Sequence, residues 1–198
     1  MNAPLNDAAL RQLFLDARTF QAFDGRPVDD ATLRTLVQTA QWAPTSMNAQ
    51  PARFVFVRSE AAKQKLRPAL AGGNVDKTMA APVTVIVASD ARFYDQLPTQ
   101  FPVMPGAREM FAGNAALAEA TAFRNSSLQG AYLILAARAL GLDTGAMSGF
   151  DNAAVDAAFF PDGQFKSNFL INLGYGAATG GTYPRGPRLG FDQIARIE

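Results

Sequence analysis

The sequence predicts one domain that mixes helices and strands. Its 198 residues, 48% hydrophobic with a formal net charge of +1, suit a single compact domain with a sizeable core. The β-branched run over residues 83–88 is typical of a buried strand, and several neighbouring segments repeat apolar residues at helical spacing. Alternating strands and helices would normally favour a parallel, doubly wound sheet, but only about four strands are convincing and helices outnumber them.

Helix caps and breakers divide the first half of the chain. Asn6 or Asp7, Asp29 or Asp30, and Ser59 are residue types whose side-chain oxygens cap a helix start. In chain order, the predicted elements are a helix over 7–16, a helix from Asp29 or Asp30 to just before Pro44, a strand over 53–57, a helix from Ser59 through Leu70 that Gly72 and Gly73 end, a helical turn over 74–79, and the strand over 83–88.

The second half begins with an irregular stretch. Residues 95–113 hold Pro98, Pro102 and Pro105 among aromatic and methionine side chains without clean periodicity, so we interpret them as a mobile cover or lid. The elements predicted after it are a long, mostly buried helix over 115–140 that Gly141 ends, a short strand over 144–147, a helix from Asp151 or Asn152 to Phe160, a strand over 169–173, and an extended tail over 177–187.

Two absent residue types limit the chemistry. The chain has no Cys and no His, which excludes disulfides, the usual zinc sites, thiol nucleophiles and Ser/His/Asp triads. An enzyme of this composition works with carboxylates, Lys, Arg and hydroxyls, or it uses an organic cofactor. The near-neutral charge disfavours nucleic acid as a partner. No apolar run approaches the roughly 20 residues needed to span a bilayer and no signal segment is evident, so we expect a cytoplasmic protein.

The run from Gln41 to Pro51 is the most informative stretch. Its two prolines bracket small polar and amide side chains, which donate hydrogen bonds to a planar heterocycle without carrying charge. The same residues also mark an ordinary helix-to-strand connection, and the pattern leaves both interpretations open.

Other motifs are weaker. The glycine-rich run over 174–180 has the wrong spacing for a dinucleotide turn, and no helix pattern follows it. Asp29, Asp30 and Glu119 are interpreted as caps and solvated faces rather than paired catalytic carboxylates. Arginines near the two ends of the chain could converge on one anionic group, because guanidinium suits phosphate: Arg18, Arg185 and Arg188.

Four blocks resemble the nitroreductase family of flavin-dependent enzymes. They are the segment 18–24, the loop 43–51 with its Pro-Thr-Ser-Met-Asn-Ala-Gln-Pro pattern, the segment 73–77, and the segment 141–151. The resemblance covers nearly the whole chain and implies one FMN-binding domain over 1–198. It also implies an α+β fold with a mostly antiparallel sheet between helices, a homodimer with FMN at the interface, and a C-terminal arm exchanged with the partner subunit.

The resemblance also assigns roles to residues. The cofactor contacts that it implies are Arg18, Thr19, Ser46, Asn48, Asn74, Lys77, Asn125, Ser148, Gly149, Arg185 and Arg188. Lys77 would stabilise negative charge on the reduced flavin near N1 and O2. The alternative interpretation is that Lys77 is a solvated surface lysine. Asn74 and Asn125 would form hydrogen bonds to the edge of the flavin ring. Gly149 would allow the backbone to approach the ring closely near N5. The alternative role for Asn48 is to shape its loop.

Details within the family are similar to malonic semialdehyde reductases of pyrimidine breakdown, with NADH or NADPH as co-substrate. Arg108 and Arg124 are then candidates for binding the substrate carboxylate. A broad nitroaromatic or quinone reductase and a non-catalytic flavin-binding module remain alternatives. Four positions depart from the family pattern, and they are Ala17, Gln21, Ala146 and Ser148, of which Ala17 replaces an arginine that binds the flavin phosphate.

Overall fold

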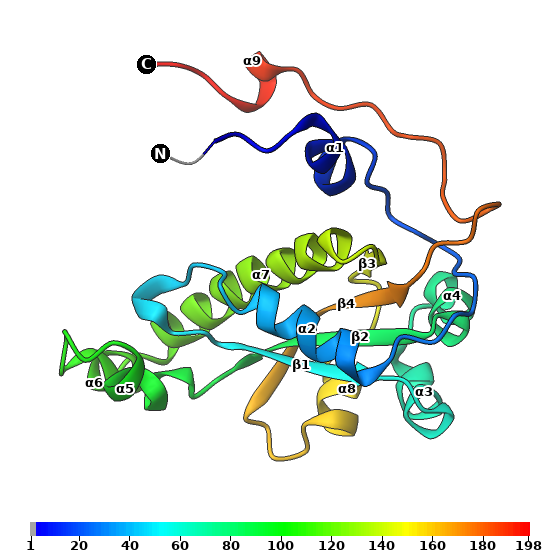
Figure 1. Cartoon of the computed structure of the whole chain (residues 1–198). Coiled ribbons are helices and arrows are strands. Elements are labelled where there is room, and N and C mark those ends of the chain that lie inside the picture. Colours follow the sequence, from blue (N-terminus) through cyan, green and yellow to red (C-terminus); the bar gives the residue numbers. More distant parts are fainter. Residues whose placement is uncertain (1–2) are drawn as a thin grey trace.

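A computed structural model describes residues 3–198 and shows helices on both faces of one sheet (Figure 1). The sheet has four strands in the order β1-β2-β4-β3, and every neighbouring pair is antiparallel. The strands are β1 (Ala52–Val57), β2 (Val83–Asp90), β3 (Asp143–Met147) and β4 (Phe165–Gly174). The antiparallel α+β fold is confirmed. Strand β4 is twice as long as the predicted strand over 169–173, since it begins at Phe165.

Strand β2 forms the centre of the core because all its residues are buried. Val83, Val85 and Val87 face α2 (Asp30–Ala40) and α7 (Ala115–Ala139). Ile86 and Ala88 face α3 (Glu60–Leu66) and α8 (Asn152–Phe159) on the other side of the sheet. This alternation follows from the two-residue period of a strand and explains why residues 83–88 are almost uninterruptedly apolar.

Side-chain caps begin the helices where the sequence predicts them. Asn6 accepts from Ala9 N at 2.9 Å, and a π-helical segment, Arg11–Leu15, continues α1 (Asp7–Leu10). The capping oxygens of Asp29, Ser59 and Asp151 each accept from the backbone N–H three residues later. Helix α7 ends at Ala139, Leu140 is its C-cap residue, and Gly141 follows with a φ of +76°, a left-handed conformation that suits glycine.

Two predicted boundaries are wrong. Gly72 and Gly73 do not end the preceding helix, which stops at Leu66 and continues as a short 3-10 turn, Arg67–Ala69. Both glycines instead begin α4 (Gly72–Ala80), so the single helical turn predicted over 74–79 is the body of a full helix.

The stretch over 95–113 is mostly helical, with turns over 101–106. It contains a 3-10 helix (Phe93–Gln96), α5 (Leu97–Gln100) and α6 (Ala107–Ala112). These short elements surround a separate apolar cluster whose centre is Phe93, Leu97 and Phe111. The rings of Phe93 and Phe111 pack edge to face with centroids 5.0 Å apart. Because each helix is shorter than two turns, no helical period could emerge from the sequence.

The C-terminal tail leaves the sheet after β4 and runs alongside the N-terminal segment, apart from the sheet layers (Figure 1). The predicted extended tail over 177–187 begins with a turn and bends over residues 178–182, and only its remainder lacks secondary structure. One turn of helix, α9 (Phe191–Ile194), follows it. Its large apolar side chains are exposed to solvent in the single chain, namely Tyr183, Leu189, Phe191, Ile194 and Ile197.

Lys63 is buried in the layer beneath α4 and is only 3% exposed. Its ammonium donates to Thr78 O at 2.6 Å, to Ala81 O at 2.9 Å and to Thr84 Oγ1 at 2.8 Å. Lysine thus satisfies carbonyls at the C-terminal end of α4, where a cation also interacts favourably with the helix dipole. Burial lowers the pKa of Lys63 from 10.5 to about 8.

That lowered pKa predicts how stability depends on pH. Between about 8 and 10.5 the unfolded chain binds more protons at this position than the folded chain. The free energy of unfolding should therefore rise with pH across this window, by up to about 1.4 kcal/mol per pH unit. Urea unfolding of the native chain and of Lys63→Met over this range measures the contribution. Equal slopes for the two proteins would show that Lys63 titrates normally.

Candidate functional site

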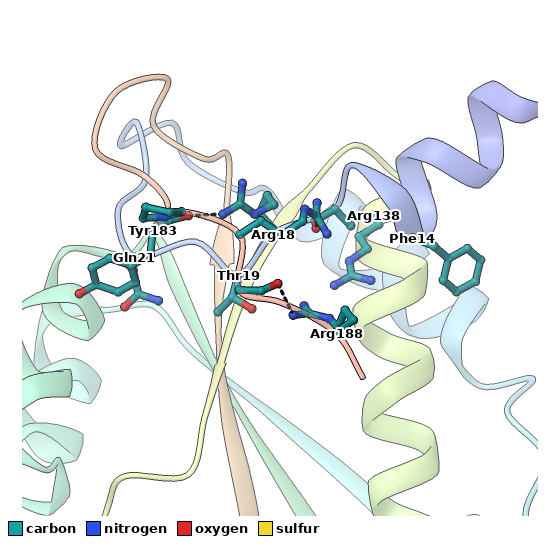
Figure 2. Close-up of a pocket in the computed structure, with 11 residues that line it drawn as sticks. Phe14, Arg18, Thr19, Gln21, Arg138, Tyr183 and Arg188 are labelled. Atoms are coloured by element: carbon teal, nitrogen blue, oxygen red, sulfur yellow. Dashed lines mark hydrogen bonds between the residues drawn. The ribbon is translucent and has the colours of Figure 1, made fainter. Parts of the chain in front are cut away.

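Three of the predicted arginines line one cavity of about 540 Å³. Its walls are the N-terminal segment 14–21, the C-terminal turn of α7 and the arm segment 183–188 (Figure 2). Arg18 donates to Tyr183 O, and Arg185 Nη2 donates to Ala17 O at 3.2 Å. Arg188 Nη1 donates to Gly186 O at 3.0 Å. The structure thus brings the two ends of the chain together around a cationic pocket that we call the arginine pocket.

Small residues allow the segment after Arg18 to lie against β3. Phe20 N donates to Thr144 O at 2.9 Å, and a Cβ at Gly145 would lie 2.4 Å from Phe20 O. A Cβ at Gly176 would meet the Phe20 ring at 2.0 Å. Within the glycine-rich run over 174–180, Gly176 therefore serves close packing of Phe20, while a Cβ at Gly174 would meet Pro82 at 2.8 Å.

Lys77 connects α4 to the arginine pocket through Gln21. Its ammonium donates to Gln21 Oε1 at 3.0 Å, and Gln21 also lines the pocket. Partial burial lowers the pKa of Lys77. No carboxylate pairs with this lysine in the part of the chain that the structure describes. Gln21, one of the departures from the family pattern, thus orients a cation instead of supplying one.

Asn74 and Gly149 lie next to Lys77, on the side away from the arginine pocket. Asn74 Nδ2 donates to Gly149 O at 2.7 Å, and Ala71 N donates to the same oxygen at 3.0 Å. A Cβ at Gly149 would lie 2.5 Å from Asn74 Nδ2, so glycine is needed for this approach. Ser148 is exposed beside it. Together Arg18, Thr19, Gln21, Asn74, Lys77, Gly149, Arg185 and Arg188 are called the α4 half-site.

Gly149→Ala is expected to displace the Asn74 amide and to lower the free energy of unfolding by about 1 kcal/mol, the usual value of one hydrogen bond. Gly73→Ala is the matched control, because nothing lies within 4 Å of its added Cβ inside α4. That control should stabilise the chain by up to about 1 kcal/mol through its higher helix propensity. Thermal unfolding compares the two. A Gly149→Ala chain as stable as the native one would contradict the proposed contact.

The loop from Gln41 to Pro51 is tightly organised. Three of its residues other than glycine have left-handed backbones, with φ of 52° at Met47, 50° at Asn48 and 43° at Gln50. Such conformations persist only where surrounding contacts impose them, and they are concentrated at functional sites. Asn48 Nδ2 donates to Gln100 O at 3.2 Å, and Gln50 Nε2 donates to Asn48 Oδ1 at 2.9 Å.

Asn125 supports this loop from α7. Its Oδ1 accepts from Ser46 N at 2.8 Å, and its Nδ2 donates to Thr121 O at 2.8 Å, with the side chain buried. Gln129, one turn further, accepts from Ala52 N at 2.8 Å. Asn125 therefore holds the loop within its own chain. The loop residues Ser46, Asn48 and Gln50 with Asn125 are called the loop half-site.

The two half-sites lie at opposite ends of the sheet (Figure 1). The α4 half-site adjoins the start of β2 at Val83, whereas the loop half-site leads into Ala52, which pairs with Ser89. At roughly 3.3 Å per residue, Val83 and Ser89 are about 20 Å apart along the strand. One chain therefore does not bring all the predicted cofactor contacts together.

The two predicted substrate arginines have different surroundings. Arg108 is paired with Asp95 at 3.0 Å, and Asp95 also pairs with Arg92 at 2.7 Å. This network ties α6 to the preceding 3-10 helix. Arg124 lies exposed on α7, with no ion pair among residues 3–198.

Sequence reasoning missed Arg138, which also lines the arginine pocket. A basic residue in the last turn of a helix is common because it favours the helix dipole, so its position carried no distinctive signal. Within the described residues, no helix is long and apolar enough to cross a membrane, and no cluster of acidic side chains is arranged to hold a metal ion.

Comparisons with known proteins show which family this chain resembles. The model of the nitroreductase family matches residues 15–175. A "Putative NADH dehydrogenase/NAD(P)H nitroreductase" of Burkholderia lata is 63% identical over 194 residues, which is 98% of each chain. A relative of the same name from Xanthomonas oryzae is 58% identical over 198 residues, the full length of both chains.

Solved structures share the fold. A Bacillus subtilis protein described as a nitroreductase has a TM-score of 0.87 at 24% identity, covering 98% of this chain and 100% of that one. A protein of Exiguobacterium sibiricum, solved in complex with FMN, has a TM-score of 0.83 at 23% identity and covers all of both chains. From the family match and the identity to full-length relatives, the chain belongs to the nitroreductase family.

Proposed function

We propose that this chain binds FMN and uses it to transfer hydride from NADH or NADPH to a small-molecule acceptor. The observation that carries the proposal is the α4 half-site, in which a multi-arginine pocket continues through Gln21 to Lys77, Asn74 and Gly149. A phosphate monoester suits the arginines, and a polar heterocycle edge suits the amide and the ammonium. The donors therefore fit a flavin mononucleotide in type and in order.

The chain's residues divide the work between binding and electrostatics. Arg18, Thr19, Arg185 and Arg188 hold the phosphate, and Asn74 with the backbone at Ser148 and Gly149 positions the ring edge. Lys77 supplies a fixed positive charge, and Gln21 limits the directions in which its ammonium can point. When bound, FMN supplies the hydride chemistry, which explains how a chain without His or Cys can be an oxidoreductase.

A homodimer would complete the site. Because the two half-sites are about 20 Å apart in one chain, we propose that the α4 half-site of one subunit meets the loop half-site of its partner. Several observations favour this assembly. Trp42 in the loop is 80% exposed, and four large apolar side chains of α7 are exposed to solvent, namely Leu117, Phe123, Leu128 and Tyr132. The apolar arm after β4 would embrace the partner. Soluble monomers rarely expose so much apolar surface.

The specific reaction we propose is reduction of malonic semialdehyde to 3-hydroxypropionate, in which the aldehyde carbon gains hydride and its oxygen gains a proton. Arg124 is the better carboxylate anchor, since its guanidinium is exposed on α7 while that of Arg108 is paired with Asp95. A nitroaromatic or quinone reductase using the same cofactor is the alternative, as is a flavin-binding module without turnover. The relatives' nitroreductase names favour the nitro substrate over the module.

Consumption of NADH or NADPH in the presence of malonic semialdehyde, a nitroaromatic and a quinone tests the substrate. We expect the semialdehyde to be reduced with the highest kcat/KM, and Arg124→Met to raise its KM while leaving that of the uncharged quinone unchanged. Turnover of the nitro compound alone would contradict the semialdehyde assignment. Failure of FMN to raise the melting temperature would contradict the flavin function itself.

A further inference from the structure

Arg138 stands in the last turn of α7 with an unusual set of contacts. Its backbone carbonyl accepts from Gln12 Nε2 at 2.7 Å, and its Nη1 donates to Leu13 O at 2.9 Å. Its Nε is buried and has no hydrogen-bond partner, which is true of no other side-chain nitrogen or oxygen buried in a non-exposed residue within 3–198. An unsatisfied donor on a charged group is costly, and in native proteins it calls for a ligand or another explanation.

The surroundings of Arg138 are strongly cationic. It lines the arginine pocket together with Arg18, Arg185 and Arg188, and Figure 2 shows its side chain extending from α7 toward the segment that carries Thr19. The acidic residue Asp143 raises the pKa of Arg138, but its Oδ2 already accepts from Gly176 N at 2.8 Å. Burial lowers the pKa of Arg138, as expected for a cation without a paired carboxylate. A dianion in the pocket would relieve the repulsion among these guanidinium groups.

The small side chain of Ala17 leaves room for Arg138 to reach the arginine pocket. Ala17, Arg18 and Arg138 line both the arginine pocket and a neighbouring cavity of about 170 Å³. The methyl side chain of Ala17 leaves this space open between α7 and the N-terminal segment, whereas a long side chain there would fill it. Arg185 binds only the backbone oxygen of Ala17.

We propose that Arg138 is a phosphate-binding residue, which supplies from α7 the guanidinium that position 17 does not provide. This inference rests on the proposed FMN function and deepens it. The group recognised is a phosphate monoester, so Arg138 should contribute to the affinity for FMN and not to that for riboflavin, which has the same ring system without the phosphate.

The test is a titration of the cofactor-free protein with FMN and with riboflavin, followed by quenching of flavin fluorescence. Arg138→Met is expected to weaken FMN binding by at least about tenfold, the usual effect of losing a charge-assisted hydrogen bond, with riboflavin affinity changed less than about twofold. Arg34→Met, at an exposed arginine on α2, is the matched control and should leave both affinities unchanged. Competition by inorganic phosphate should weaken FMN binding to the native chain more than to Arg138→Met.

Further variants separate binding from docking of the N-terminal segment. Gln12→Ala removes the bond to the Arg138 carbonyl but keeps the guanidinium, so FMN affinity should be retained. Ala17→Arg added to Arg138→Met should restore FMN affinity, and Arg138→Lys should restore it in part. The inference is overturned if Arg138→Met binds FMN like the native chain, if it loses riboflavin equally, or if Gln12→Ala reproduces its defect. A native chain that binds neither flavin would instead overturn the proposed function.

Discussion

Lys77→Met is expected to slow reduction of bound FMN by NADH or NADPH by about a hundredfold or more, the usual effect of removing one preorganised electrostatic group. Methionine is close to lysine in length and removes the charge. The side chain is held by Gln21 at 3.0 Å and faces no carboxylate among the described residues, so its charge is available to the cofactor. Stopped-flow absorbance under anaerobic conditions gives the rate directly.

The pH profile of the same step adds a second readout. Because burial lowers the pKa of Lys77, the native reduction rate should decline at a lower pH than an ordinary lysine would require. The Lys77→Met profile should lack this decline. Lys65→Met, at an exposed lysine on α3, serves as the control and should reduce at the native rate. An unchanged reduction rate in Lys77→Met would contradict this role and would indicate that Lys77 is only a solvated surface lysine.

Subunit complementation is expected to restore activity to a mixture of two inactive variants. Lys77→Met damages the α4 half-site, and Asn125→Leu damages the loop half-site by leaving Ser46 N without its acceptor. If each active site combines the two half-sites from different subunits, a mixed dimer has one intact site and one site with both defects. Random pairing then restores about a quarter of the native sites in a symmetric dimer.

The control for complementation is a pair of variants within one half-site. Lys77→Met mixed with Asn74→Leu should regain nothing, because no combination of these chains yields an intact α4 half-site. Dissociation and reassociation of purified subunits, followed by activity measurement, compares the two mixtures. Absence of rescue for Lys77→Met with Asn125→Leu, with mixed dimers demonstrated by mass, would show that the half-sites do not meet between subunits.

The sequence predicted helix starts correctly where a single capping residue determines them. Asn6, Asp29, Ser59 and Asp151 cap their helices because a side-chain oxygen there satisfies a backbone N–H that has no other partner. Gly72 and Gly73 were misassigned because glycine is compatible with either end of a helix. Strand direction could not be read from the residues, since it depends on pairing between segments far apart in the sequence.

The sequence predicted which residue types belong to the candidate site better than it predicted how they contact one another. Arg18 and Arg185 share a pocket, yet the sequence could not show that Asn125 binds Ser46 within its own chain or that Lys77 contacts Gln21. Those contacts arise from α7 and α4 packing against distant segments. Arg138 could not be identified from the sequence because its significance depends on its place in the arginine pocket, which only three-dimensional packing reveals.

The central claim is that this chain is an FMN-dependent NAD(P)H oxidoreductase, and the visible spectrum of the purified protein tests it most directly. After incubation with FMN and removal of free flavin, the account predicts a retained flavin spectrum that bleaches on anaerobic addition of NADH or NADPH. A colourless protein after this treatment would contradict the binding claim. A yellow protein that neither nicotinamide bleaches would contradict the catalytic one.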